Sequence, residues 1–311
     1  MQHLLHLKDW TTDEIKSTLD LATKIKAKPT KYFDTLKNKT LIMLFQKTST
    51  RTRLSFEAAM TELGGHGIFL DSRTTQLSLS DFRDEIKAIM RLGNGLMFRA
   101  KKFTDVQLAA SQNQVPVIDA CSEKYHPCQS LADVLTMIEH SGGLDKIKKV
   151  AWLGIENNVS NTLKLICAKL GIKITIIAPE KDPDSLDEEL DKIADATGLV
   201  TYTTNLEAGL KDADYVHTDT WINMEFFENG QIKPDFQAEY DRRLATFKPY
   251  QLNADLINKY CPKAKIMHCM PCHVDYEISR DAIDHPNAVI FDQAENRLHV
   301  QKAALVKLLS Q

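Results

Sequence analysis

Hydroxyl and guanidinium side chains are concentrated in residues 48–53, which read Thr-Ser-Thr-Arg-Thr-Arg. An apolar, β-leaning run over residues 40–45 precedes them, and apolar residues at helical spacing follow until Gly64. The start of a helix offers unpaired backbone N–H groups and partial positive charge, so an anion placed there gains hydrogen bonds and a charge-assisted contact to Arg51. The segment therefore predicts a phosphate site at a strand-to-helix junction, with the helix beginning near Thr52. The alternative is an ordinary helix start with two solvated arginines.

Two other segments place a histidine and a proline at expected element boundaries. The first, His126-Pro127-Cys128-Gln129, opens an apolar run at helical spacing, and the second, His268-Cys269-Met270-Pro271, follows a β-leaning run. A histidine can donate a hydrogen bond or move a proton near neutral pH. Because a lone histidine is more often a core or surface residue, only its neighbours Pro127 and Gln129 favour a functional interpretation of His126.

Residues 49–57, Ser-Thr-Arg-Thr-Arg-Leu-Ser-Phe-Glu, resemble the carbamoyl-phosphate signature of the transcarbamylase family, and the two histidine segments follow in the family's order. The resemblance extends over about residues 4–309, nearly the whole chain. It implies a carbamoyl phosphate site that comprises Ser49, Thr50, Arg51, Thr52, Gln76, Arg99, His126, Gln129, Cys269, Met270 and Arg297.

The same resemblance implies a catalytic role for Arg99, His126, Cys269 and Arg297. Arg99 is expected to contact both the phosphate and the carbonyl oxygen, while its alternative is a surface cation. His126 is expected to donate to the carbonyl oxygen and Gln129 to accept from the carbamoyl NH2 group. Loss of one such donor typically costs about 3 kcal/mol in the transition state. That Cys269 accepts a proton from the attacking amine is a hypothesis.

Residues 154–158 and 219–224 resemble the amino-acid-binding segments of family members that use ornithine. This similarity implies an ornithine site formed by Asn158, Asp219, Asn223 and Met224, in which Asp219 holds the α-ammonium group. The expected reaction transfers the carbamoyl group from carbamoyl phosphate to the δ-amine of L-ornithine, yielding L-citrulline and phosphate. The resemblance implies no metal and no organic cofactor.

Two departures from the family pattern leave other functions open. Asn223 stands where a serine is usual, and residues 76–81 stand where the family has a glycine-rich basic loop that reaches a neighbouring subunit's active site. One alternative is a transcarbamylase for putrescine, an N-acylated ornithine or another amine. The other is a catalytically weak homologue kept for binding or assembly. The chain argues against it, because it retains all of Arg51, Arg99, His126, Gln129, Asp219 and Arg297.

Cys269 and Cys272 form a Cys-x-x-Cys pair, a spacing found in metal and redox sites. No second pair completes the four ligands of a structural zinc site, so we expect no metal here. Residues 149–161 read as a strand, a glycine and a helix, but they lack the G-x-G-x-x-G pattern of a dinucleotide site.

Strand-like and helix-like runs alternate along the chain, which predicts parallel sheets with helices on both faces. Strands are expected at residues 40–45, 67–70, 96–99, 115–119, 149–153, 173–178, 200–203, 215–218, 265–268 and 288–291. Helices are expected at residues 12–25, 55–63, 84–91, 129–140, 159–170, 185–196 and 295–309. The three motif segments lie at carboxyl ends of strands, where doubly wound sheets bind ligands.

We therefore predict an α/β protein with two doubly wound parallel-sheet domains, divided near Ser141-Gly142-Gly143. Residues 1–141 are the expected carbamoyl-phosphate domain and residues 149–294 the expected ornithine domain. The resemblance adds that the C-terminal helix, within residues 295–311, packs back on the first domain.

Composition restricts the partners and the compartment. The 311 residues are 43% hydrophobic and carry a net charge of −3, which gives no general reason to expect nucleic acid or a membrane as partner. No apolar run approaches the roughly 20 residues of a membrane-spanning helix, and the N-terminus lacks the build of a signal peptide. Six scattered cysteines fit a reducing compartment, so a cytoplasmic location is expected. The expected partners are small-molecule substrates, and the resemblance implies a homotrimer or a multiple of trimers.

Overall fold

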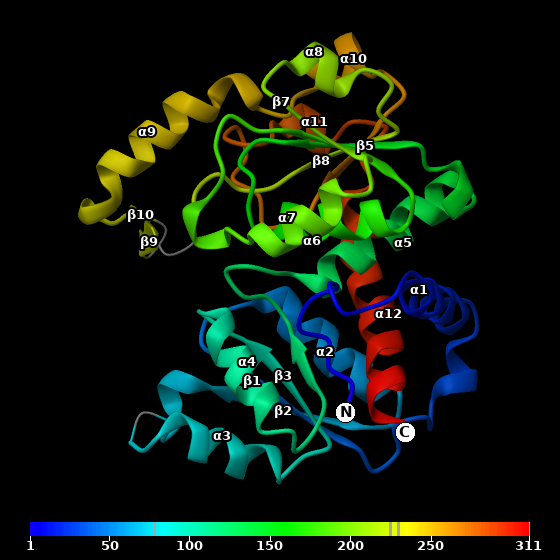
Figure 1. The fold of residues 1–311 in the computed structure, drawn as a ribbon, viewed down its shortest axis with the longest axis vertical. Helices are drawn as coiled ribbons and strands as arrows, with labels where there is room; N and C mark the ends of the chain where they lie inside the picture. Colours follow the sequence, from blue (N-terminus) through cyan, green and yellow to red (C-terminus); the bar gives the residue numbers. More distant parts are fainter. Residues whose placement is uncertain (78, 224–225, 229–230, 311) are drawn as a thin grey trace. The chain divides into compact units, whose positions relative to one another are not determined.

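The computed structural model describes residues 1–77, 79–223, 226–228 and 231–310, and its elements form two compact units (Figure 1). The first unit comprises Met1–Leu135, Asn161–Ile166 and Glu295–Gln311, and the second comprises Thr136–Ser160 and Cys167–Ala294. Each unit is built on a parallel sheet with helices packed against it. The predicted α/β fold class with two parallel sheets is thereby confirmed.

The sheet of the first unit has the strand order β2-β1-β3-β4. Its strands are β1 (Thr40–Phe45), β2 (His66–Asp71), β3 (Gly95–Arg99) and β4 (Val117–Asp119). The last residues of three strands lie in register, because Phe45 of β1 pairs with Asp71 of β2 and with Arg99 of β3. The loops that follow β1 and β3 therefore start side by side at the carboxyl edge of the sheet.

Helices of the first unit include α1 (Thr12–Ala27), α2 (Thr50–Glu62), α3 (Phe82–Met90) and α4 (Phe103–Ser111), together with residues 127–135 of α5 (Pro127–Ser141) and parts of α6 (Asn158–Lys169) and α12 (Ile290–Leu309). In Figure 1, α3 and α4 lie on the side of the sheet away from α12. Sequence reasoning did not predict α4. The start of α2 was predicted near Thr52, but the helix begins two residues earlier, at Thr50, and its first turn contains Arg51 and Thr52.

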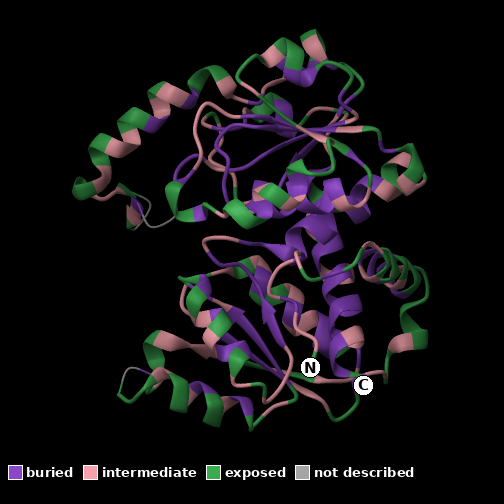
Figure 2. Ribbon diagram, viewed as in Figure 1, coloured by how far each residue is buried: buried purple, intermediate pink, exposed green. Residues whose placement is uncertain are grey.

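The C-terminal helix α12 (Ile290–Leu309) corrects one predicted strand. Residues 288–291 were expected to form a strand, but Ala288 makes only an isolated bridge to Ile266 and Ile290 already begins α12. A short apolar run fits a buried helix start as well as a strand, so periodicity could not separate the two. Figure 2 shows the middle of α12 as buried, in agreement with full burial of residues 300–305.

Contacts with α1, α2 and α5 hold α12 against the first unit, as predicted. Lys302 pairs with Glu62 of α2, and Lys307 Nζ donates to the Glu14 carbonyl of α1 at 3.1 Å. Arg297 contacts Gln129 of α5. The helix therefore joins three elements that are far apart in sequence.

The sheet of the second unit has the order β11-β8-β5-β6-β7, and all its pairs are parallel. Its strands are β5 (Lys149–Leu153), β6 (Lys173–Ile177), β7 (Val200–Thr203), β8 (Tyr215–Thr218) and β11 (Lys265–His268). Leu153, Thr218 and His268 close three neighbouring strands in register. The segments that follow them, which carry the predicted ornithine residues, therefore start next to one another.

Around this sheet lie α7 (Glu188–Asp195), α8 (Leu206–Leu210), α9 (Gln237–Phe247), α10 (Ala254–Tyr260), α11 (Arg280–Ile283) and parts of α6 (Asn158–Lys169). Figure 1 shows α8 and α10 on one face of the sheet and α7 on the other. A small hairpin, β9 (Phe227–Glu228) and β10 (Gln231–Ile232), precedes α9. None of the described helices has the length and apolarity needed to cross a membrane.

Candidate functional site

The loop between β1 and α2 is fixed beside the end of β3. Gln46 donates its backbone N–H to the Arg99 carbonyl at 2.9 Å, and its side chain bonds both the Lys101 N–H and the Asp105 carboxylate. Ser49 is the extended residue before α2, and its hydroxyl makes no capping hydrogen bond. The first-turn N–H groups of α2 are thus not capped by Ser49 and can donate to an anion at this end of the helix.

Arg297, Gln129 and Thr52 meet in the interior of the first unit. Arg297 Nη1 donates to Gln129 Oε1 at 2.7 Å, and Arg297 Nη2 donates to Thr52 Oγ1 at 3.3 Å. Gln129 is oriented from its other end, because its Nε2 donates to Asp133 Oδ1 at 2.8 Å. An amide oxygen has two lone pairs, so Gln129 Oε1 can accept one further hydrogen bond.

His126 lies just before α5, and a hydrogen bond from its backbone N–H fixes its position. Its N–H donates to Thr162 Oγ1 at 2.9 Å, its side chain is buried, and its Nδ1 has no hydrogen-bond partner among the described residues. Burial lowers the pKa of His126 well below its ordinary value, and the positive charges of Arg297 and Arg99 lower it further. The imidazole is therefore neutral at pH 7.

Arg99 ends β3 at the same edge of the sheet. Its Nε is buried and finds no hydrogen-bond partner within the part of the chain that the structure describes. A buried donor without a partner is costly in a folded protein. The Nε–H of Arg99 and the ring nitrogen of His126 are thus two polar groups that a small ligand could satisfy.

Gln76, one of the residues predicted to bind carbamoyl phosphate, is not part of the group formed by Thr52, Gln129 and Arg297. It is exposed in the loop between β2 and α3, where its carbonyl accepts the N–H of Leu79 at 2.9 Å. Its role stays a prediction.

Asp219 and Cys269 meet at the carboxyl edge of the second sheet. The Cys269 thiol donates to Asp219 Oδ1 at 2.9 Å, and Asn157 Nδ2 donates to Asp219 Oδ2 at 2.8 Å. Each carboxylate oxygen thus receives one hydrogen bond and keeps a lone pair for a cationic ligand. Because the thiol is here a donor, it can accept a proton from an amine only after its own proton has moved to Asp219.

The contacts described for the other predicted ornithine residues do not include Asp219. Asn158 is the first residue of α6, and Asn223 Nδ2 lies 3.5 Å from Asp182 Oδ2. Met270, which was predicted to bind carbamoyl phosphate, has a φ of +54° and donates its N–H to His268 Nδ1 at 2.8 Å. Met224 lies outside the described residues.

Sequence analysis included Asn157 in the segment 154–158 but did not name it as a site residue. Its side chain orients Asp219, and its Oδ1 accepts the N–H groups of Val159 and Ser160 at the start of α6. An asparagine directly before a helix is a common cap, and that signal alone could have drawn attention to it. Its contact with Asp219, across 62 residues of sequence, could not be read from a local pattern.

Asp219, His268 and Cys269 place their potential metal-ligating atoms within 4.8 Å of one another. The Asp219 oxygens are bonded to Asn157 and Cys269, and both His268 ring nitrogens are bonded to Met270 N and Glu277. A metal would have to replace these hydrogen bonds, so the group is better described as an internal network.

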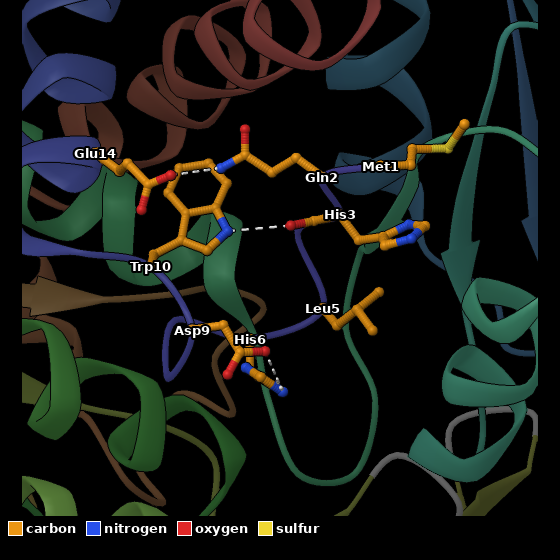
Figure 3. Close-up of a pocket in the computed structure, with 8 residues that line it drawn as sticks. All are labelled: Met1, Gln2, His3, Leu5, His6, Asp9, Trp10 and Glu14. Carbon is orange, nitrogen blue, oxygen red and sulfur yellow. Dashed lines mark hydrogen bonds and ion pairs between the residues drawn. The ribbon is translucent and has the colours of Figure 1, made fainter. Parts of the chain in front are cut away.

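A hollow of about 460 Å³ opens at the N-terminal segment (Figure 3), where Trp10 Nε1 donates to the His3 carbonyl and Gln2 to Glu14. It is lined by Met1, Gln2, His3, Leu5, His6, Asp9, Trp10 and Glu14. None of the residues predicted to bind a substrate lines it.

Two models of known protein families match the chain, one in its N-terminal part and one in its C-terminal part. A family model described as the carbamoyl-P binding domain of aspartate/ornithine carbamoyltransferase matches residues 2–139, and a model of the Asp/Orn binding domain matches residues 146–308. The chain belongs to the aspartate/ornithine carbamoyltransferase family. The resemblance inferred from the motifs is thereby confirmed.

Members of this family with known names and structures match along their full length. The ornithine carbamoyltransferase of Archaeoglobus fulgidus is 38% identical over 99% of this chain and 98% of its own, and that of Bacillus subtilis is 39% identical over 98% and 93%. The structure of the ornithine carbamoyltransferase from Pyrococcus furiosus has a TM-score of 0.88 at 38% identity and covers 99% of this chain and 97% of its own.

Proposed function

We propose that this protein transfers the carbamoyl group of carbamoyl phosphate to the δ-amine of L-ornithine, with L-citrulline and phosphate as products. Full-length relatives named ornithine carbamoyltransferase, at 36–39% identity, support this reaction. The observation that carries it is the buried group of Arg297, Gln129 and Thr52, with a neutral His126 and a cationic Arg99 in the same unit.

The first unit has the groups that a carbamoyl phosphate needs. We assign the phosphate to Ser49, Thr50, Arg51 and Thr52, where helix N–H groups, hydroxyls and a guanidinium provide donors and charge. The neutral His126 donates to the carbonyl oxygen as negative charge develops on it, and Gln129 Oε1 accepts from the NH2 group. Arg99 and Arg297 stabilise the charge on the departing phosphate.

The second unit has the groups that an amino acid needs. We assign the α-ammonium group to Asp219, whose two oxygens are already oriented by Asn157 and Cys269. Asn158 and Asn223, with Met224, are assigned to the α-carboxylate. The attacking amine must be unprotonated, although its ordinary pKa is about 10.4, so the thiol–carboxylate pair of Cys269 and Asp219 is the proposed route for its proton.

Three further proposals concern the whole chain. We propose residues 1–141 with the C-terminal helix as the carbamoyl-phosphate domain and residues 149–294 as the ornithine domain, supported by the two family models. The six free cysteines support a reducing, cytoplasmic location. A homotrimer or a multiple of trimers is proposed from the family resemblance, and sedimentation should give about three chain masses or a multiple of that value.

The reaction is tested by offering carbamoyl phosphate with L-ornithine, N-acetyl-L-ornithine or putrescine and measuring ureido product and phosphate. We expect citrulline in amounts equal to the phosphate released. Putrescine lacks the α-carboxylate and leaves its donors unsatisfied, at about 1–3 kcal/mol for each buried group. Faster carbamoylation of putrescine or of the acylated amine would contradict the assignment, as would phosphate release without a ureido product.

A further inference from the structure

Glu277 is a fully buried carboxylate in the segment between β11 and α11. Its backbone is anchored to the body of the second unit, because its carbonyl accepts the N–H of Leu252 at 2.9 Å. A buried carboxylate is rare unless its charge is compensated by hydrogen bonds or cations. The groups that compensate Glu277 also contact residues next to Cys269 and Asp219, in the two segments of the proposed amine site.

The Oε1 atom of Glu277 receives two hydrogen bonds. His268 Nε2 lies 3.2 Å away and the backbone N–H of His273 2.6 Å away, while His273 Nδ1 lies 3.7 Å from Oε2. Burial raises the pKa of Glu277, but the hydrogen bonds from His268 and His273 outweigh this effect and lower it to about 2. Glu277 is therefore ionised throughout the physiological pH range.

One arm of the network runs from Glu277 through His268 to Met270. Because His268 Nδ1 accepts the Met270 N–H at 2.8 Å, the ring hydrogen must sit on Nε2, which donates to Glu277. The backbone N–H of His268 is held by Gln293 Oε1 at 2.9 Å. These bonds hold Met270 in a left-handed conformation, which a non-glycine residue rarely adopts. They also orient the intervening residue, Cys269.

The other arm runs from Glu277 through His273 to Thr220. His273 Nδ1 lies 2.9 Å from Thr220 Oγ1, which donates its own hydrogen to the Ile222 carbonyl. His273 Nδ1 is therefore the donor in this contact. Thr220 directly follows Asp219, so this arm ends at the residue assigned to the α-ammonium group. Phe227 stacks on the His273 ring with centroids 4.9 Å apart and restricts its rotation.

We propose that Glu277 is a positioning residue for carbamoyl transfer, which holds the Cys269 and Asp219 segments together through His268 and His273. Glu277 does not contact a substrate in this role. It keeps Cys269 Sγ within hydrogen-bond distance of Asp219 Oδ1. This inference rests on the proposed function, because it assigns a purpose to the geometry of that same amine site.

Steady-state kinetics of Glu277→Gln and Glu277→Met test the proposal. The amide oxygen of glutamine can accept both hydrogen bonds now made to Oε1, so E277Q should keep kcat within about fivefold. Methionine has a similar size but no acceptor, and a misplacement of about 1 Å can cost 100-fold, so kcat of E277M should fall on the order of 100-fold. KM for carbamoyl phosphate should change less than kcat, because its phosphate is assigned to Ser49, Thr50, Arg51 and Thr52, and only Cys269 and Met270 of its predicted site belong to this network.

Glu239→Met is the control, because Glu239 is also a hydrogen-bonded carboxylate of the second unit, but its partners are Arg242 and Arg243. Its kcat should equal that of wild type. If E277M folds, as judged by its thermal unfolding, and keeps wild-type kcat, Glu277 is only structural and the proposal is wrong. If E277M does not fold, His273→Phe carries the test, since it breaks one arm and keeps an aromatic ring for Phe227; unchanged kcat of H273F would overturn the proposal.

A readout that does not need turnover separates this inference from the proposed reaction. The alkylation rate of Cys269 by iodoacetamide, resolved by peptide mass spectrometry, should rise at least fivefold in E277M or H273F, because the thiol is no longer held against the Asp219 carboxylate. It should stay near the wild-type rate in E277Q. An unchanged rate in E277M and H273F would overturn the positioning role, whereas wild-type protein that makes no citrulline would overturn the proposed function.

Discussion

His126 shows how burial and nearby charge set the chemistry of one side chain. Its ring is buried, and the guanidinium groups of Arg297 and Arg99 oppose a second positive charge, so its pKa is lowered. A neutral imidazole donates from one nitrogen and accepts at the other. It can therefore donate to a carbonyl oxygen without delivering a full proton to the substrate.

Replacing Arg297 by methionine tests the buried group of the first unit. R297M loses the donors to Gln129 Oε1 and Thr52 Oγ1 together with a positive charge. We expect kcat/KM for carbamoyl phosphate to fall about 100- to 1,000-fold, as for other donors that act in a transition state. The exposed Arg91, which bonds Gln114, is the control. Equal losses in R91M and R297M would refute a specific role for Arg297.

The lowered pKa of His126 predicts a pH dependence of stability. Below its ordinary pKa of about 6.5, the histidine is protonated in the unfolded chain but stays neutral in the folded protein. The unfolded state then binds more protons, so stability falls as pH falls below about 6.5, by up to about 1.4 kcal/mol per pH unit from this residue. Urea denaturation of wild type and H126Q between pH 5 and 7 measures this. Parallel pH curves for the two proteins would contradict it.

At the scale of elements, strand ends gather the site residues, and this part of the fold was predictable. Five strands, β1, β5, β7, β8 and β11, have the predicted bounds. Four of them are short, largely buried runs, whereas the edge strand β7 has no buried residue and is rich in β-branched and aromatic side chains. The start of α2 was less predictable, since residues 50–54 contain two threonines and two arginines and lack an apolar period. The hairpin β9–β10 and the helix α9 were not predicted either, although Tyr240, Leu244 and Phe247 of α9 recur at helical spacing.

The turn after β5 depends on Gly154. Its φ is +117°, and a Cβ atom there would lie 2.7 Å from Nε1 of the buried Trp221. Gly154→Ala should destabilise the protein by about 2–4 kcal/mol, through the backbone conformation and through displacement of Trp221. Gly171→Ala is the matched control, because Gly171 also has a positive φ but has open space around its Cβ position. If urea unfolding shows equal losses for the two variants, the contact with Trp221 is not important.

At the scale of the molecule, α12 connects the start and the end of the chain within the first unit. Its residues bond α1, α2 and α5 across 293, 240 and 168 positions of sequence, respectively. Motif resemblance could name Arg297, Gln129 and Thr52 separately. Which of them bond one another, and that Asn157 and Glu277 support the amine site, depends on tertiary contacts that no local pattern encodes.

The pair Glu62 and Lys302 tests how α12 is held. Lys302 is almost fully buried and Glu62 is half exposed, so Glu62→Ala leaves a buried ammonium group without its carboxylate. We expect E62A to lower the free energy of unfolding by about 1–3 kcal/mol. K302M should cost less, and adding K302M to E62A should restore part of the loss, as measured by urea unfolding. Additive losses in the double variant would show that the two charges do not interact.

Direct observation of the transferred atom tests the central claim. Carbamoyl phosphate labelled with carbon-13 should be mixed with L-ornithine and the protein, and the carbon and phosphorus spectra followed together by NMR. We predict that the label becomes the ureido carbon of citrulline while inorganic phosphate accumulates in equal amount. Label that appears only as bicarbonate, or as the ureido carbon of a different amine added in competition, would contradict the account.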